Sequence, residues 1–169
     1  MKVRFKRLDE RAVPPTKADG DNAYDLYPVF DEDAVVILPG FSNKFDTMLS
    51  MELPEGHAMF ICNRGSRGSV GLVYGAHVID ESYRGSIILD LHNISTYPII
   101  VSDLSETVLF MDPEIGNLKR TYRNVTVIPK SKPLAQGAII KTETVEWVES
   151  DELGDTERGS GSFGHTDNK

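Results

Sequence analysis

The sequence has a single cysteine, Cys62, among its 169 residues, so no disulfide can form within the chain. This scarcity fits a protein of a reducing compartment. Positive charge is also scarce: 18 lysine and arginine residues stand against 26 aspartate and glutamate residues, which gives a formal net charge of −8. Such a chain is not expected to bind nucleic acid or anionic membranes in general, although a few converging arginines can hold one polyanionic ligand.

Long apolar runs are missing as well. No run approaches the ~20 residues that a membrane span needs. Residues 1–7 alternate charged and apolar side chains and lack the apolar core of a signal peptide. We therefore expect a cytoplasmic protein without a transmembrane segment, and the length suits one domain with a sizeable core.

A sustained helical stripe is absent too. Short apolar or alternating runs, rich in Val, Ile, Thr and aromatic residues, dominate the chain, and Gly, Pro, Asn and Asp lie between many of them. The pattern predicts an all-β fold, either a sandwich or a jelly roll. The expected strands are residues 3–5, 34–38, 48–53, 58–62, 87–91, 98–101, 108–111, 125–128 and 138–148.

Two regions depart from this regularity. Residues 102–132, which contain Asp112-Pro113 and a basic run at 119–123, are expected to form an inserted hairpin or loop within a β domain that covers 1–148. The tail, 149–169, has only two sizeable apolar side chains, so it cannot bury enough surface to fold alone. A tail that orders only over a ligand would act as a flexible lid that excludes water.

Residues 74–85 have the pattern of a hairpin that holds a carboxylate against a flat ligand. An apolar strand is followed by a glycine turn, and then by Asp80, Tyr83 and an arginine. The carboxylate can take a proton from water, the ring can cover a sugar or a base, and the backbone can read polar edges. The alternative is a plain hairpin, in which Asp80 caps a turn and Tyr83 packs on the sheet.

Residues 158–166 interleave a cation, glycines, hydroxyls and one aromatic ring. Glycine lets backbone N–H groups approach phosphate oxygens. Arg158 adds a bidentate contact, and Phe163 can stack on a base. Composition alone also allows a disordered polar tail at this place.

Five stretches in fixed order resemble the motifs of the trimeric dUTP pyrophosphatase (dUTPase) family. They lie at 21–26, 64–68, 74–85, 134–136 and 158–166. The sequence departs from the family at Gly65, where serine is usual, and at Pro133, where arginine or lysine is usual. The segment 102–132 also separates the third and fourth motifs by more than compact members allow.

The resemblance implies a distorted jelly-roll β-barrel or sandwich that converts dUTP and water to dUMP and pyrophosphate. Such an enzyme sanitises the nucleotide pool and supplies dUMP. The reaction is a Mg²⁺-assisted attack of water on the α-phosphorus. It further implies a homotrimer, in which each C-terminal tail crosses to a neighbouring subunit.

The resemblance also assigns roles to residues. Asp80 is the expected general base, and Tyr83 is expected to pack on the deoxyribose and exclude a 2′-hydroxyl. Gly75, Val78 and Ile79 would line the uracil pocket through their backbone groups. Such a pocket rejects cytosine because polar groups would be left unpaired.

At the phosphate end the resemblance implies that Arg64, Gly65 and Ser66 meet the triphosphate. Asp25 would act near Mg²⁺ through water, with a structural role at the site's edge as its alternative. Gln136 would be a site-wall or intersubunit residue. In the tail, Arg158 would grip the terminal phosphate, and Phe163 and Gly164 would close over the nucleotide.

Two other classes of function stay open. The sister family, dCTP deaminase, shares the fold; its Ala-His-x-Ile-Asp resembles Ala76–Asp80 here, and Asp90 stands where it has a catalytic glutamate. However, the carboxylate of Asp90 is shorter, and Ser69 stands where that family has an arginine. Alternatively, a dUTPase-like protein could dock another protein through 102–132, with nucleotide binding as its switch.

Overall fold

The computed structural model describes residues 1–156 and 158–160, and most of its regular structure is β. Its strands are β1 Arg4–Arg7, β2 Tyr24–Leu26, β3 Ala34–Ile37, β4 Ser42–Asp46, β5 Leu49–Glu52, β6 His57–Asn63, β7 Leu72–Tyr74, β8 Val78–Ile79, β9 Ile88–Asn93, β10 Ile99–Ser102, β11 Thr126–Ile128 and β12 Ala135–Lys141. The helices are α1 Gly65–Gly68, α2 Glu106–Met111 and α3 Pro113–Thr121. No helix in the described part of the chain is long and apolar enough to cross a membrane.

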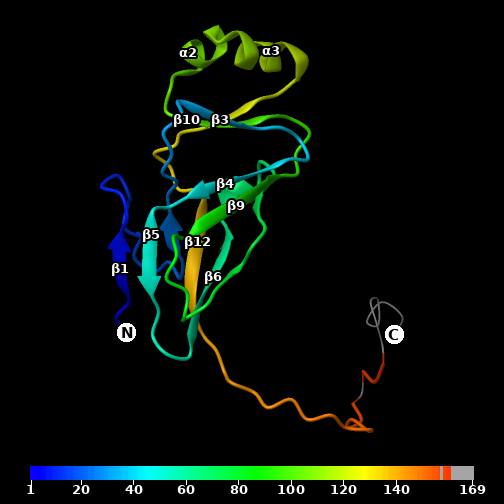
Figure 1. Cartoon of the computed structure of the whole chain (residues 1–169). Coiled ribbons are helices and arrows are strands. Elements are labelled where there is room, and N and C mark those ends of the chain that lie inside the picture. The colour runs from blue at the N-terminus through cyan, green and yellow to red at the C-terminus, as the bar shows by residue number, and fades with distance from the viewer. Residues whose placement is uncertain (157, 161–169) are drawn as a thin grey trace.

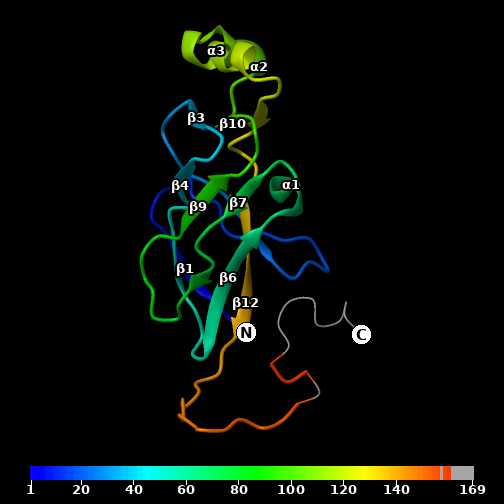
Figure 2. The same ribbon diagram turned by 90° about the vertical axis from the view of Figure 1, so that its right-hand side faces the viewer.

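The strands form four small sheets that stack into one body (Figures 1 and 2). Their orders are β1-β5, β11-β10-β3, β2-β12-β6-β8 and β4-β9-β7. The longest ladder joins β6 and β12 over seven residue pairs, from Ala135 opposite Asn63 to Lys141 opposite His57. The described strands close no single barrel, which fits a distorted jelly roll and confirms the all-β prediction.

Alternation along the strands builds the core. On β9, Leu89, Leu91 and Asn93 are buried, while the residues between them lie on the half-exposed face. This period of two is the pattern of a strand with one buried face. The largest fully buried side chains are Phe45, Leu26, Ile37, Leu49, Ile61, Leu72, Ile87, Leu89, Leu91, Ile99, Ile100 and Leu109.

The inserted segment is helical, so the prediction of a hairpin or loop, with a strand at 108–111, was wrong. The Ser105 side chain accepts a hydrogen bond from the Val108 N–H at 3.4 Å and begins α2. Asp112 accepts from the N–H groups of Glu114 and Ile115 at 2.9 and 3.0 Å, and Pro113 occupies the first turn of α3. The two helices connect β10 to β11, which pair in parallel and therefore need a crossover.

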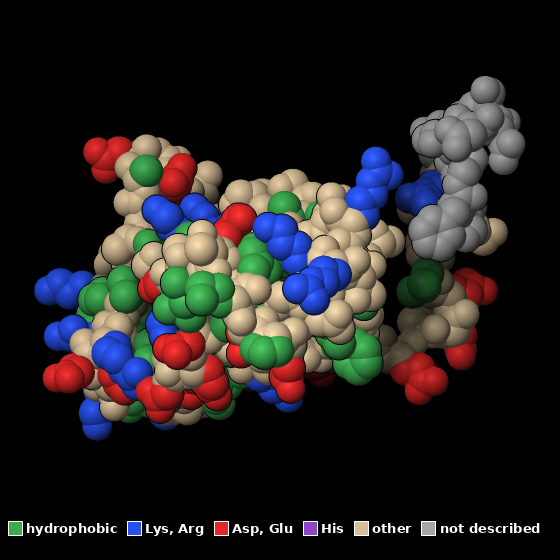
Figure 3. Space-filling model, turned by 90° about the horizontal axis from the view of Figure 1, so that it is seen from above, with side chains coloured by type: hydrophobic (Ala, Val, Ile, Leu, Met, Phe, Trp, Pro, Cys, Tyr) green, Lys and Arg blue, Asp and Glu red, His purple; other side chains and the backbone are tan. Residues whose placement is uncertain are grey.

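The final predicted strand, 138–148, was too long, because β12 ends at Lys141. Residues 142–156 contain no strand or helix and lead away from the body (Figure 1). Val145, Trp147, Val148 and Leu153 are exposed there, Trp147 to 92%. Acidic side chains stand along this segment (Figure 3).

Candidate functional site

One group of the predicted residues meets at the end of β6. In the β2-β12-β6 sheet, Gln136 lies opposite Asp25 on one side and opposite Cys62 on the other. Arg64 follows β6 directly, and its Nε donates to Asp25 Oδ1 at 2.7 Å. Both side chains are less than one third exposed. The first, second and fourth sequence motifs therefore form one polar cluster around an arginine.

The short helix α1 presents the rest of the second motif beside this cluster. Gly65 and Ser66 are exposed, and the Arg67 Nε donates to the Pro133 carbonyl at 3.1 Å. Burial, and then the positive charge of Arg64, lower the pKa of Arg67 from its usual value. Two guanidinium groups thus lie close enough to repel each other, which is a charge arrangement suited to a polyanionic ligand.

Asn63 ties this cluster to the predicted hairpin, and sequence reasoning missed it. Its carbonyl accepts from the Gln136 Nε2 at 2.9 Å, and its Oδ1 accepts from the Tyr74 N–H at 2.6 Å. One residue therefore holds both the side chain beside Asp25 and the strand end that precedes Gly75. Its position next to Arg64 is the only sequence signal that could have pointed to it.

The hairpin crosses between two sheets. β7 belongs to the β4-β9-β7 sheet and β8 to the β2-β12-β6-β8 sheet, where β8 is the last strand. The His77 carbonyl accepts from the Ile61 N–H at 2.7 Å, and Val78 lies opposite Phe60. Since antiparallel residues alternate between facing the partner strand and facing away, the N–H and C=O of Val78 face the free edge. Val78 as a whole is also 57% exposed.

Asp80 and Tyr83 follow β8 at the surface. The Tyr83 N–H donates to the backbone carbonyl of Asp80 at 3.1 Å, so the turn is closed by the main chain rather than by the Asp80 carboxylate. The Tyr83 hydroxyl donates to the Ser86 carbonyl at 3.0 Å, and the residue as a whole is 43% exposed. An added Cβ at Gly85 would overlap that ring. The alternatives of a turn-capping aspartate and a core tyrosine therefore do not describe these two side chains.

Within one chain, the Asp80 end of the hairpin and the arginine cluster remain apart. Ile79 lies opposite Met59, whereas Arg64 comes five residues later, directly after the end of β6, and at about 3.3 Å per residue this is roughly 16 Å. The residues predicted as one site are thus two half-sites in the described chain. Arg158 lies exposed in the tail, and Phe163 and Gly164 lie outside the described residues.

His77 lies within the predicted hairpin, and its contacts lead toward β6. Its Nδ1 is 2.6 Å from the Ile61 carbonyl, and its ring stacks on Phe60 with centroids 5.2 Å apart. Tyr74 meets the same ring edge-on. His77 therefore anchors the hairpin to the sheet.

The described residues contain no cluster of three or more His, Cys, Asp or Glu that could hold a metal ion. One oxygen of Asp25, the predicted metal contact, accepts from Arg64. Mg²⁺ in nucleotide sites commonly uses one or two carboxylates together with substrate phosphates and water. These residues therefore fit an ion held mainly by phosphates and water, and they do not fit a cage of protein side chains.

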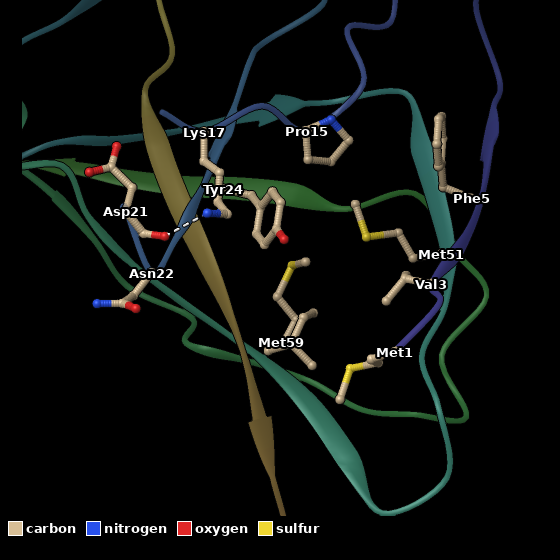
Figure 4. A pocket seen from close by; sticks show the side chains of 11 residues that line it. Met1, Val3, Phe5, Pro15, Lys17, Asp21, Asn22, Tyr24, Met51 and Met59 are labelled. Carbon is tan, nitrogen blue, oxygen red and sulfur yellow. Dashed lines mark hydrogen bonds between the residues drawn. The ribbon is translucent and has the colours of Figure 1, made fainter. Parts of the chain in front are cut away.

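A cavity of about 550 Å³ lies elsewhere, between β1, β5, β6 and β12 (Figure 4). Three methionines dominate its apolar part, and the Lys17 Nζ donates to the Asp21 carbonyl at its rim at 2.8 Å. The residues that line it are Met1, Val3, Phe5, Pro15, Lys17, Asp21, Asn22, Tyr24, Met51, Met59 and Ile139. Neither Asp80 nor Arg64 contributes to it.

A scan of protein-family models finds no match for this chain. Among curated proteins, the deoxyuridine 5′-triphosphate nucleotidohydrolase of Hydrogenobaculum sp. is 32% identical over 170 residues, with 98% of each chain covered. A mutant dUTPase of Staphylococcus bacteriophage 80alpha, solved with dUpNHpp, has a TM-score of 0.72 at 23% identity, with 98% of each chain covered. A mutant dUTPase of the S. aureus phage phi11, described as coordinating a structural Mg(II) ion, has a TM-score of 0.67 at 20% identity, covering 90% of this chain and 99% of its own.

Proposed function

Because the chain belongs to the deoxyuridine 5′-triphosphate nucleotidohydrolase (dUTPase) family, its activity is dUTP hydrolysis, and we propose that Asp80 activates the attacking water. The observation that carries this role is that Asp80 is exposed and stands in the chain between β8, the last strand of its sheet, and the exposed Tyr83. The relatives are named as dUTP hydrolases, so the dCTP deaminase alternative gains no support from them.

In the proposed reaction, a water oxygen bonds to the α-phosphorus while its proton passes to the Asp80 carboxylate. The bond from the α-phosphorus to the bridging oxygen breaks, and its electron pair leaves with pyrophosphate. Arg64, with the exposed Ser66 and the N–H groups of α1, meets the negative charge of the phosphates. Charge stabilisation of this kind commonly contributes a large part of the rate.

The free edge of β8 would read the base. Val78 offers one N–H donor and one C=O acceptor side by side, which matches the donor and acceptor of a uracil edge. Tyr83 would lie against the deoxyribose with its exposed face, leaving no room for a 2′-hydroxyl. Rejection by unpaired polar groups is the stronger of the two forms of selection, since it can exceed 10⁴-fold.

Mg²⁺ is the proposed cofactor, and when bound it neutralises charge on the phosphates. Asp25 would hold a water of its shell, since Arg64 keeps the carboxylate in place. Arg64 itself would remain free to turn its remaining N–H groups toward the nucleotide.

We further propose a homotrimer in which the tail crosses to a neighbouring copy. Two observations support it. Ile79, next to Asp80, lies opposite Met59, and Arg64 comes five residues after Met59, a span of roughly 16 Å along an extended strand, which supports a site that another copy completes. The segment 142–153 also exposes Val145, Trp147 and Val148 between acidic residues.

The methionine-lined cavity suits this segment from a second copy. Beside it runs β1, whose four residues are all exposed and whose far edge pairs with no described strand. Lys2, Lys6 and Lys17 give this region positive charge, while Glu143, Glu146 and Glu149 give the segment negative charge. An exposed strand edge is a ready template for a second chain.

Trp147 reports on this docking because it is the only tryptophan in the chain. In the assembled protein its fluorescence should have the blue-shifted emission of a buried indole. Dilution below the dissociation threshold should shift the emission to the red, in step with a fall in mass by light scattering. Emission of a water-exposed indole in a sample that scatters as a trimer would contradict this docking.

The activity is tested by supplying dUTP, dCTP, dTTP and UTP with Mg²⁺ and identifying the products. Only dUTP should give a nucleoside monophosphate and pyrophosphate. Asp80→Asn should reduce kcat by ~10²- to 10⁴-fold, while binding of a non-hydrolysable dUTP analogue survives. Asp33→Asn, at an exposed loop before β3, is the matched control. Near-wild-type turnover of Asp80→Asn would show that Asp80 is not the base.

A further inference from the structure

The half-exposed face of β9 carries a polar pair that none of the roles above uses. Asp90 Oδ1 is buried and has no hydrogen-bond partner, and it is the only such side-chain atom in the described part of the chain. His92 Nε2 lies 3.6 Å from it, within ion-pair range and beyond a hydrogen bond. A buried carboxylate oxygen without a donor is unfavourable, so its presence calls for a reason.

The pair lies directly against Gly75, where the hairpin begins. The Gly75 N–H donates to the Asp90 carbonyl at 2.9 Å. A Cβ at position 75 would lie 2.9 Å from His92 Cδ2, closer still to His92 Nε2, and 3.5 Å from Asp90 Oδ2. The φ angle of Gly75 is not positive, so glycine is needed here for room rather than for its backbone conformation.

The charge of Asp90 also acts on Tyr74, the residue before Gly75. Burial, and then the Asp90 carboxylate, raise the pKa of Tyr74 to about 12. The Tyr74 hydroxyl donates to the Ile88 carbonyl at 3.0 Å, and its N–H is bound by Asn63. Tyr74 is therefore fixed at both ends, and the hairpin leaves β7 at the next residue, Gly75.

We propose that Asp90 and His92 are positioning residues for base selection. Asp90 attracts the His92 imidazole, the imidazole bounds Gly75, and Gly75 sets the start of the segment that ends at the Val78 edge. The inference rests on the proposed function of that edge. A Val78 edge fixed in this way selects uracil, because cytosine presents the opposite order of donor and acceptor. If the segment were mobile, it could shift to meet either base.

Steric coupling between Gly75 and His92 gives the sharpest test. Gly75→Ala should lower kcat/KM for dUTP, because the new methyl group meets the imidazole. His92→Ala removes that imidazole. The kcat/KM of the double variant should therefore be about tenfold higher than the two single losses would give if they added, a coupling typical of residues in contact. His57→Ala is the matched control, since His57 is also half-buried but stands at the start of β6.

Base selection is the second readout. His92→Ala and Asp90→Asn should each raise KM for dUTP and lower the ratio of kcat/KM for dUTP over dCTP by about tenfold, with kcat on dUTP nearly unchanged. The His57→Ala ratio should equal that of the wild type. An unchanged ratio in both β9 variants, or additive effects of Gly75→Ala and His92→Ala, would overturn the proposal.

Hydrogen exchange separates this inference from the proposed function, because it needs no nucleotide. In the free protein, the Gly75 amide should exchange at least ~10-fold faster in Asp90→Asn and His92→Ala, as expected when a local opening becomes easier. If the wild type does not hydrolyse dUTP, the proposed function fails and this readout still applies. Unchanged Gly75 exchange in both variants would remove the positioning role itself.

Discussion

Asn63 offers the clearest test of how the arginine cluster is connected to the hairpin. Its Oδ1 is the acceptor for the Tyr74 N–H at 2.6 Å, and Tyr74 is only 4% exposed. In Asn63→Leu the side chain keeps its length but loses the acceptor, so a buried N–H is left without a partner. The cost of such an orphaned donor is about 1–3 kcal/mol.

This cost converts into a measurable change in melting temperature. For a domain of this size, 1 kcal/mol corresponds to roughly 2–4 °C, so the melting temperature should fall by roughly 2–12 °C. Asn63→Asp keeps an acceptor at the same place, so its melting temperature should fall less. Both variants must be compared with the wild type at one protein concentration, because assembly makes the melting temperature depend on concentration.

Amide hydrogen exchange adds a local readout. The Tyr74 amide should lose protection in Asn63→Leu, and it should keep most of it in Asn63→Asp. The reasoning is refuted if Asn63→Leu melts within about 2 °C of the wild type, the smallest shift expected, while the Tyr74 amide stays protected.

Tyr74 has a folded-state pKa raised from 10.0 to about 12, so its stabilisation is complete below pH 10 and is lost as the pH rises toward 12; Tyr74→Phe should flatten the fall in stability across that window in urea titrations. Gly65→Ser points into open space, so it should leave the melting temperature unchanged and lower KM for dUTP by supplying the family's hydroxyl; a raised KM would argue against that contact. Deleting 155–169 should keep the thermal transition and sharply lower kcat, and Arg158→Ala should reproduce much of this loss, whereas full activity of the truncated chain would exclude a lid. Chelation with EDTA should abolish turnover, and addition of Mg²⁺ should restore it. The far-ultraviolet circular dichroism should stay unchanged throughout, as expected for an ion bound with the nucleotide.

Most strands were predictable because their signal is local. Residues 34–38, 58–62 and 98–101 are apolar or alternating runs, and each matches a strand of the structure to within two residues at either end. The two-residue strand β8 escaped prediction because it has no periodicity of its own and depends on pairing with β6.

The helices of the insertion show the opposite failure. Residues 108–111 form a short apolar run, which does not distinguish a strand from a helix. The deciding signals were the caps, Ser105 and Asp112-Pro113, and these outweigh the apolar run in the folded chain. Nothing local in the sequence showed that β10 and β11 would pair in parallel.

The candidate site, like the fold, was predictable only in part. Motif order predicted that Asp25, Arg64 and Gln136 belong together, and the structure joins them through the β2-β12-β6 sheet. Asn63 and His92 could not be predicted, because their roles arise from contacts between residues 11 and 17 positions apart. Such contacts become visible only when the strands have been placed.

The free edge of β8 bears on how base preference can change over generations. An N–H and a C=O are present at position 78 whatever side chain the codon specifies, so most replacements there leave both groups in place. Proline alone deletes the donor. Drift at this position should therefore be tolerated, and a new preference would have to arise from residues such as Asp90 and His92 that move the strand as a whole.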